Sequence, residues 1–169
     1  SIKGMITPGF IDLQVNGGGG ELFNNNPQIT TLRTMVNAHR QFGTHFILPT
    51  LITAHDTLIH QALDSVEEAI EKKIPGILGI HLEGPMIHPK RRGIHNEKAI
   101  HSLSEPLLSR LCQANGRLGH ILITLAPERV SPALIQRLTE AQITVFAGHT
   151  EATPKELERA KQSGLQGFT

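Results

Sequence analysis

Apolar residues recur along the chain in two alternating patterns: short continuous runs, and longer stretches in which they return at steps of three and four. The runs are typical of buried strands, and the stepped stretches are typical of helices with one apolar face. We expect strands at residues 9–15, 44–50, 77–82, 118–125 and 143–147, with a sixth opening at residues 167–169.

Helix signals lie between these runs. Pro27 and Pro132 stand where proline fits the first turn of a helix, and Asp56 is expected to cap the second helix. The segment Thr153-Pro154-Lys155-Glu156 is a capping box. These signals predict helices that begin near residues 27, 56, 104, 132 and 154, and Gly43 is expected to end the first of them.

Strands that alternate with helices at a spacing of about 25–35 residues predict an α/β fold with a parallel sheet. The unit length suits a (β/α)8 TIM barrel, of which this chain would supply about five of the eight units, because a complete barrel takes about 250 residues. A doubly wound sheet is the alternative. It requires a glycine-rich turn that enters a helix directly, whereas Gly17–Gly20 is expected to form a flexible loop and the next helix begins only near Pro27.

Composition narrows the class of protein. The chain has 169 residues, of which 38% are hydrophobic and 18% charged, so it is long and apolar enough for a globular core. The net charge of +1 gives no basic field for nucleic acid. No apolar run approaches the ~20 residues of a membrane span, and no signal peptide is visible. The single cysteine, Cys112, forms no internal disulfide and favours the cytoplasm.

The two ends of the sequence predict a piece of a longer protein. It starts at Ser1 rather than Met and reaches an apolar strand within a few residues, and it stops at Gly167-Phe168-Thr169, where a strand opens. A barrel fragment would leave its first and last strands unpaired. We therefore expect an isolated chain to aggregate or dimerise through these edges.

Candidate chemistry should lie at the carboxyl ends of the strands, where parallel barrels carry their active sites. The polar residues there are Asp12, Gln14, Asn16, Thr50, Thr53, Glu83, Glu128 and His149. Glu83 and His149 each end an apolar strand that offers no counter-charge. A buried carboxylate is costly without a partner, and carboxylate with imidazole is an ordinary Zn²⁺ ligand pair.

Purely structural roles are also open for these residues. Glu83 could cap a helix or pair with a cation of the segment Lys90-Arg91-Arg92, and His149 could be a core histidine bonded to backbone. The three basic residues could be a solvated face or could favour an anionic substrate. His95 could donate a hydrogen bond to a ligand or simply lie on the surface.

Five motifs then stand in order. They are Pro8-Gly9-Phe10-Ile11-Asp12, His81-Leu82-Glu83-Gly84-Pro85, residues 90–96, Leu125-Ala126-Pro127-Glu128 and Ala147-Gly148-His149-Thr150. Together they resemble the N-acetylglucosamine-6-phosphate deacetylase family of the amidohydrolase superfamily. The resemblance covers essentially the whole chain.

The resemblance implies a barrel of the metal-dependent hydrolase type that hydrolyses the acetamide of N-acetylglucosamine 6-phosphate to glucosamine 6-phosphate and acetate. Glu83 and His149 match metal ligands, and Ile94 and His95 match substrate-binding positions. Gln14 and Asn16 replace the His-x-His of two-metal relatives. They therefore imply one divalent ion near them, with zinc as the first choice and iron, cobalt, manganese or nickel as alternatives.

The same resemblance places residues 1–169 in the N-terminal part of the catalytic barrel domain, without the small β-domain and the C-terminal units. A second histidine ligand, the phosphate-binding residues and an aspartate that acts as acid and base would lie beyond Thr169. We therefore expect no catalytic aspartate in this sequence, weak metal binding and little turnover by the chain alone. The full-length protein is expected to be a cytoplasmic homo-oligomer, a dimer or tetramer, that binds a sugar phosphate and neither nucleic acid nor a membrane.

Two rival functions remain open at this point. One is a different amide hydrolase, such as an N-acetylgalactosamine-6-phosphate deacetylase or a cyclic-amide hydrolase. The other is a truncated, non-catalytic remnant that at most binds sugar phosphate.

Overall fold

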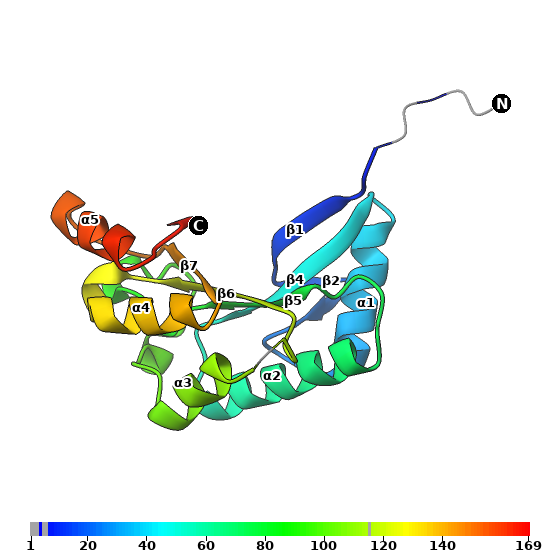
Figure 1. Cartoon of the computed structure of the whole chain (residues 1–169). Helices are drawn as coiled ribbons and strands as arrows, with labels where there is room; N and C mark the ends of the chain where they lie inside the picture. Colours follow the sequence, from blue (N-terminus) through cyan, green and yellow to red (C-terminus); the bar gives the residue numbers. More distant parts are fainter. Residues whose placement is uncertain (1–3, 5–6, 115) are drawn as a thin grey trace.

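The computed structural model describes residue 4, residues 7–114 and residues 116–169. Six parallel strands form one sheet that curls across the molecule (Figure 1). In spatial order they are β1 (Phe10–Val15), β4 (Thr44–Ile52), β5 (Gly79–Glu83), β6 (His120–Leu125), β7 (Thr144–Ala147) and β8 (Gly167–Phe168). The spatial order equals the chain order. A doubly wound sheet reverses direction at a switch point, so that alternative is wrong.

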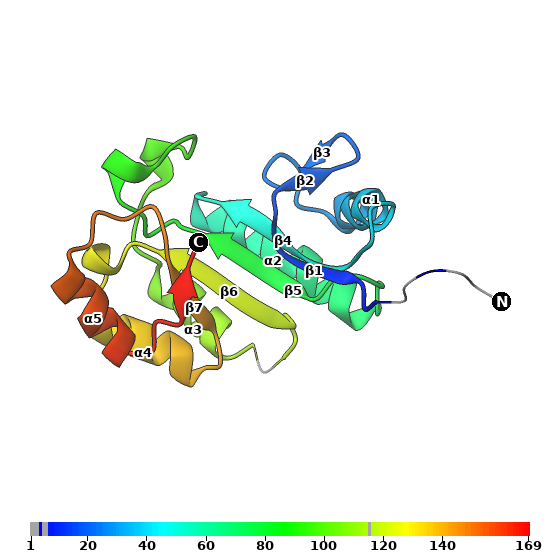
Figure 2. The same ribbon diagram turned by 90° about the horizontal axis from the view of Figure 1, so that it is seen from above.

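Five helices connect the strands and lie outside the curve of the sheet, as the two views in Figures 1 and 2 show. They are α1 (Ile29–Arg40), α2 (Asp56–Glu71), α3 (Glu105–Cys112), α4 (Pro132–Glu140) and α5 (Pro154–Gln162). Right-handed crossovers between strands that advance in one direction put every helix on the same face. The result is a curled parallel half-barrel, which confirms the predicted α/β class; the expected number of barrel units stays a prediction.

The main core fills the space between the sheet and these helices. On α1 the buried residues are Thr31, Leu32, Met35 and Val36, and α2 buries Ile59, Ala62, Leu63, Ser65, Val66 and Ala69. The apolar stripes predicted from three- and four-residue steps are thus the faces that meet the sheet. Among the described residues no helix is both long and apolar enough to cross a membrane.

Several predicted boundaries are wrong. The glycine run is not a flexible loop but part of a small hairpin, β2 (Gly17–Gly18) with β3 (Glu21–Leu22). Helix α1 begins at Ile29, because Gln28 is still extended and serves as the N-cap. Asp56 does not cap α2; it is the first helical residue, and its Oδ1 lies 3.6 Å from His101 Nε2.

Strand β4 continues past its predicted end at residue 50 to Ile52, although it contains Pro49. Pro49 is the partner of Val15, and the ladder between β1 and β4 is irregular just before that pair. The N–H group that Pro49 lacks therefore costs the sheet few hydrogen bonds at this position. Leu51 and Ile52 pair with β5 instead, which keeps the strand in the sheet.

The capping box predicted at the start of α5 is confirmed, and α4 also begins with a side-chain cap. The Ser131 side chain accepts a hydrogen bond from the Leu134 amide at the start of α4. At the start of α5, Glu156 Oε2 accepts from the Thr153 amide at 2.7 Å while the Thr153 hydroxyl accepts from the Glu156 amide. These hydrogen bonds satisfy amide groups that the first turn of a helix leaves free.

Both edge strands of the sheet carry exposed apolar side chains. Phe10 and Ile11 on β1 are 70% and 56% exposed, and Phe168 on β8 is 67% exposed. The inner face of the sheet is apolar toward the amino ends of the strands, which we call its lower end, where Leu48, Leu122 and Phe146 line a hollow. Its upper end, at the carboxyl ends of the strands, is polar.

Candidate functional site

Three titratable side chains meet at the carboxyl end of the sheet. Glu83 is the last residue of β5, His149 lies two residues beyond β7, and His95 lies in the long loop after β5. One ligand atom from each lies within 4.8 Å of the others. The fold therefore unites Glu83 and His149, as expected from their strand ends, and adds His95.

The hydrogen bonds of His149 fix the orientation of its ring. Nδ1 lies 2.8 Å from the carbonyl oxygen of Arg91. Because a carbonyl only accepts, Nδ1 carries the proton and a neutral ring presents a lone pair at Nε2. That lone pair faces Glu83 Oε1 at 2.7 Å. Two acceptors at this distance repel, so the pair requires a proton or a metal cation between them.

The carboxylate of Glu83 is buried, with 5% of the residue exposed. Its Oε2 accepts a hydrogen bond of 3.0 Å from Gln14 Nε2, and its Oε1 faces both histidines. The described cation contacts of Glu83 are thus His95 and His149, and the alternative in which it pairs with Lys90, Arg91 or Arg92 is wrong.

His95 is buried rather than on the surface, with 3% of the residue exposed. Its Nδ1 lies 2.8 Å from the Thr53 hydroxyl, and its Nε2 lies 3.8 Å from Glu83 Oε1. Burial lowers the pKa of His95, the charge of His149 lowers it further, and Glu83 opposes both. The neutral ring therefore offers a lone pair or a single N–H to the centre of the group.

A cavity of about 360 Å³ opens onto these three side chains. Gln14 and Asn16, which were expected near the metal, line it, and so does Ile94, which is 90% exposed. The remaining lining residues are Leu22, Asn24, Asn25 and Ile52. The cavity thus combines amide groups with an apolar wall.

Asn24 is a site residue that the sequence did not reveal. Its Nδ2 donates to the Ile52 carbonyl at 3.0 Å, and its Oδ1 accepts from the Ile52 amide at 2.9 Å. This pair of hydrogen bonds ties the segment after the β2–β3 hairpin to the end of β4. The only signal in the sequence was an asparagine run after a glycine run, which is typical of any turn.

The basic segment after β5 does not point freely into the site. Arg91 Nε and Lys90 Nζ lie 3.4 and 3.7 Å from the Glu151 carboxylate, and Arg92 Nε lies 3.4 Å from Glu97. Their charges are thus partly balanced within the protein. This arrangement weakens the interpretation of the segment as an anion site.

Two further strand-end residues have structural contacts. Glu128 accepts hydrogen bonds from the Thr150 hydroxyl and the Glu151 amide, so it contacts the loop that carries His149 and not the group itself. Asp12 Oδ1 accepts from the Gln14 amide at 3.1 Å. Neither carboxylate belongs to the group of three among the described residues.

A buried histidine below the site also escaped the sequence interpretation. His81 is fully buried, with Nε2 at 2.8 Å from the Thr124 hydroxyl and Nδ1 at 3.3 Å from the Thr50 hydroxyl. Burial lowers its pKa to about 4, although the Glu83 charge and a hydrogen bond to the Leu13 carbonyl act in the opposite direction. His81 is therefore neutral near pH 7 and holds neighbouring strands together.

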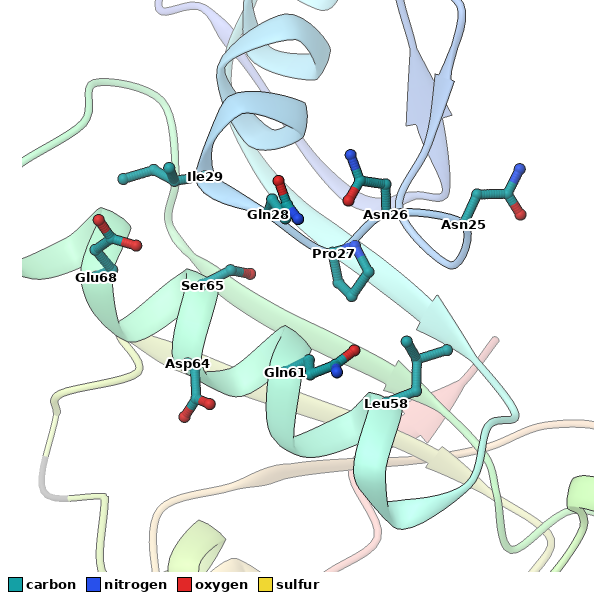
Figure 3. A pocket seen from close by; sticks show the side chains of 10 residues that line it. All are labelled: Asn25, Asn26, Pro27, Gln28, Ile29, Leu58, Gln61, Asp64, Ser65 and Glu68. Atoms are coloured by element: carbon teal, nitrogen blue, oxygen red, sulfur yellow. The ribbon is translucent and has the colours of Figure 1, made fainter.

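A separate groove of about 490 Å³ lies on the outer side, between the segment before α1 and helix α2 (Figure 3). Amide side chains such as Asn25, Asn26 and Gln61 dominate its lining. Its carboxylates Asp64 and Glu68 pair with Arg110 and Lys72. Among the described residues, no group of three metal ligands occurs there.

Comparison with known proteins gives a consistent result. No family model matches the chain. It is 44% identical over 167 residues to N-acetylgalactosamine-6-phosphate deacetylase from Shewanella sp. (strain ANA-3), which covers 99% of this chain and 42% of the relative. It is 33% identical over 164 residues to N-acetylglucosamine-6-phosphate deacetylase from Haemophilus influenzae, which covers 97% of this chain and 42% of the relative.

Solved structures agree with the sequence relatives. N-acetylglucosamine-6-phosphate deacetylase from Pasteurella multocida superposes with a TM-score of 0.89 at 34% identity, covering 95% of this chain and 42% of that one. A mutant of the Mycobacterium smegmatis enzyme in complex with N-acetyl-D-glucosamine-6-phosphate gives a TM-score of 0.85 at 29% identity, covering 95% and 42%.

Sequence and fold together make the chain a homologue of the sugar-phosphate deacetylases. Within that class its relatives are the N-acetylglucosamine-6-phosphate and N-acetylgalactosamine-6-phosphate deacetylases. The chain spans about two fifths of the length of the curated relatives it matches.

Proposed function

We propose that this protein takes part in the metal-dependent hydrolysis of the acetamide of an N-acetylated amino-sugar 6-phosphate. The observation that carries the proposal is the contact between Glu83 Oε1 and His149 Nε2, in which the Arg91 carbonyl engages Nδ1 and so turns Nε2 toward a buried carboxylate. The relatives at 33–44% identity are deacetylases of such sugars.

The side chains present fit a divalent cation. One carboxylate and imidazole nitrogens within 4.8 Å of one another form a donor set that suits Zn²⁺, and iron, cobalt, manganese and nickel also accept it. In our proposal Glu83 and His149 hold a single ion, with Gln14 and Asn16 beside it. When bound, the ion supplies Lewis-acid polarisation of the amide carbonyl and makes water more acidic.

The protein residues orient the reacting groups. Gln14 holds Glu83 Oε2 by a hydrogen bond of 3.0 Å, so the other carboxylate oxygen stays directed at the histidines. His95 and the backbone of Ile94 are proposed to contact the substrate from the other wall of the cavity. A general base that takes the proton of water and returns it to the leaving amine is also required; the expected aspartate stays a prediction.

A variant separates the two roles that His95 can have. If it contacts the substrate, His95→Gln raises KM while the affinity for Zn²⁺ stays within about twofold of the original. If it is instead a metal ligand, the Zn²⁺ affinity falls together with activity. Titration of the variant with Zn²⁺ in competition with a chromophoric chelator measures this difference.

N-acetylgalactosamine 6-phosphate is the second candidate substrate, because the identity to the Shewanella relative is 44% while that to the Haemophilus relative is 33%. The two sugars differ at one hydroxyl. Release of acetate from each sugar by a full-length protein that carries this chain, compared as kcat/KM, separates them. The absence of turnover on both sugars would favour the non-catalytic alternative.

The central experiment removes the metal and restores it. We expect a protein carrying this chain to lose acetate release after treatment with a chelator, and to regain it with Zn²⁺ or another of the named ions. Glu83→Gln should prevent the recovery, whereas Glu105→Gln on the distant helix α3 should not. Turnover that survives complete removal of metal would contradict the proposal.

The wider context of the protein is part of the same proposal. The half-barrel is proposed to be the N-terminal part of a catalytic barrel, and about five units is our expectation for its contribution. The exposed apolar edges on β1 and β8 support self-association of the chain. The free thiol of Cys112 suits a reducing compartment, and we propose the cytoplasm.

A further inference from the structure

The loop that carries His149 is held in an uncommon conformation. His149 has a φ of 49°, in the left-handed region that a residue with a side chain rarely adopts. Such a conformation persists only where surrounding contacts hold it. Two carboxylates outside the proposed metal site, Glu128 and Glu151, provide contacts of this kind.

Glu128 holds the backbone directly after His149. Its Oε2 accepts from the Thr150 hydroxyl at 2.5 Å, and its Oε1 accepts from the Glu151 amide at 2.7 Å. The Thr150 hydroxyl oxygen in turn accepts from the Ala152 amide at 2.9 Å. Both oxygens of the Glu128 carboxylate thus accept hydrogen bonds from the two residues that follow His149.

Glu151 holds the segment on the other side of the ring. Its carboxylate lies 3.4 Å from Arg91 Nε and 3.7 Å from both Lys90 Nζ and His88 Nε2. The His88 amide donates to the His149 carbonyl at 2.9 Å. These contacts hold the basic segment in a position where the Arg91 carbonyl accepts a hydrogen bond from His149 Nδ1.

We propose that Glu128 and Glu151 are positioning residues for His149, which together set its backbone conformation and the orientation of its ring. The inference rests on the proposed function in one respect, the role of His149 as a metal ligand. It also assigns the basic residues Lys90 and Arg91 a role: they dock the segment whose carbonyl fixes the ring, in place of the anion binding that the sequence suggested. Outer partners of this kind fix which nitrogen of a histidine is free for the metal.

The first test needs no metal. Long-range ¹H–¹⁵N correlation spectra of the metal-free chain should show His149 with its proton on Nδ1, protected from exchange with solvent. Glu128→Gln keeps one acceptor oxygen and removes the carboxylate acceptor from either the Thr150 hydroxyl or the Glu151 amide, so we expect the His149 Nδ1–H signal to broaden or vanish. Glu151→Gln should accelerate its exchange severalfold.

The second test measures the affinity for Zn²⁺ by competition with a chelator. We expect Glu128→Gln to weaken binding about tenfold and Glu151→Gln about threefold, in line with the loss that follows removal of an outer partner. The matched control is Glu105→Gln, which breaks a carboxylate–arginine contact of Glu105 with Arg137 far from the site. Its Zn²⁺ affinity should stay within twofold even though its unfolding midpoint falls.

The outcomes separate this inference from the proposed function. If the original chain does not bind Zn²⁺ but the His149 signal is lost in Glu128→Gln, the metal site is wrong and the positioning role stands. If Zn²⁺ binds and both glutamine variants keep the His149 signal and an affinity within twofold, the positioning role is wrong. Restoration of the signal by Glu128→Asp, which retains a carboxylate, would further support the inference.

Discussion

Two neighbouring layers on the inner face of the sheet both contain a histidine, but the hydrogen-bond partners of the two rings differ. In the lower layer, His81 has hydroxyl partners for both ring nitrogens. The upper layer lies two residues further along β5, at Glu83. There His149 Nδ1 donates its proton to the Arg91 carbonyl, and His149 Nε2 faces a carboxylate oxygen of Glu83. One layer is complete with neutral protein groups, whereas the other requires a proton or a metal cation between its two acceptors.

The hydrogen bonds of the lower layer form a consistent chain. Thr50 donates its hydroxyl to the Leu48 carbonyl at 3.1 Å, so His81 Nδ1 is the donor toward Thr50. His81 Nε2 then accepts from Thr124, whose oxygen lies 2.6 Å from the Thr169 hydroxyl. Buried polar groups with partners stabilise a fold. The contrast teaches that acceptors placed against each other mark the ligand site better than burial does.

The largest expected effect is the loss of the metal from the upper layer. Glu83→Gln removes the charge that offsets the cation, and we expect Zn²⁺ affinity to fall more than about a hundredfold, beyond the cost of losing an outer partner. Thermal unfolding of the metal-free variant should change little, because the repulsive contact with His149 disappears. A large loss of stability with intact Zn²⁺ binding would reverse the two assignments.

The pH dependence of stability should report the lower layer. The pKa of His81 is about 4 in the folded protein and 6.5 for an ordinary histidine, so the unfolded chain binds more protons between these values. The free energy of unfolding should therefore be fully retained above pH 6.5 and decrease as the pH falls toward 4. At 1.36 kcal/mol per unit the loss attributable to this ring is about 3 kcal/mol.

Urea unfolding of the chain and of His81→Gln across this pH range measures that contribution as a difference. Contributions from groups that both proteins share cancel in the difference. An identical pH profile for the two proteins would show that His81 is not the titrating group.

Removal of the His81 ring should cost about 2 kcal/mol. His81→Leu removes one hydrogen-bond partner from each of the buried Thr50 and Thr124 hydroxyls, and losing a single partner of a buried polar group is the costly way to lose a hydrogen bond. Adding Thr124→Val should recover part of the loss, since an apolar pair of similar shape has no unsatisfied group. Urea titration of the single and double variants tests this, and strict additivity would contradict it.

The smallest effect is expected at the rim of the cavity. Asn24→Ala breaks both hydrogen bonds to Ile52, and we expect a loss of about 1 kcal/mol. Because Asn24 touches neither Glu83 nor His149 in the described contacts, Zn²⁺ affinity should stay within twofold. A tenfold loss of affinity would extend the metal site to the rim.

The sequence predicted most of the fold because its apolar pattern is strong. Continuous runs gave all six strands of the main sheet, and the steps on α1 and α2 identified their buried faces. Errors arose where a local signal has two meanings. The glycines at residues 17–20 suit a loop or a hairpin equally, and Asp56 suits a cap or the first turn.

The site was predictable in part for a related reason. Glu83, His149 and Gln14 lie at or within two residues of the carboxyl ends of their strands, so the parallel order brings them together. His95 and Asn24 come from loops, whose path depends on contacts that no periodicity records. His81 lies inside a strand, where sequence alone does not tell a buried structural histidine from a ligand.

The central claim is that Glu83 and His149 hold one metal ion, and anomalous X-ray scattering at the zinc edge tests it most directly. In crystals grown with Zn²⁺ we predict a single strong peak about 2.0–2.2 Å from a Glu83 oxygen and from His149 Nε2. A peak elsewhere, or a Glu83–His149 contact that stays closed at full Zn²⁺ saturation, would contradict the account.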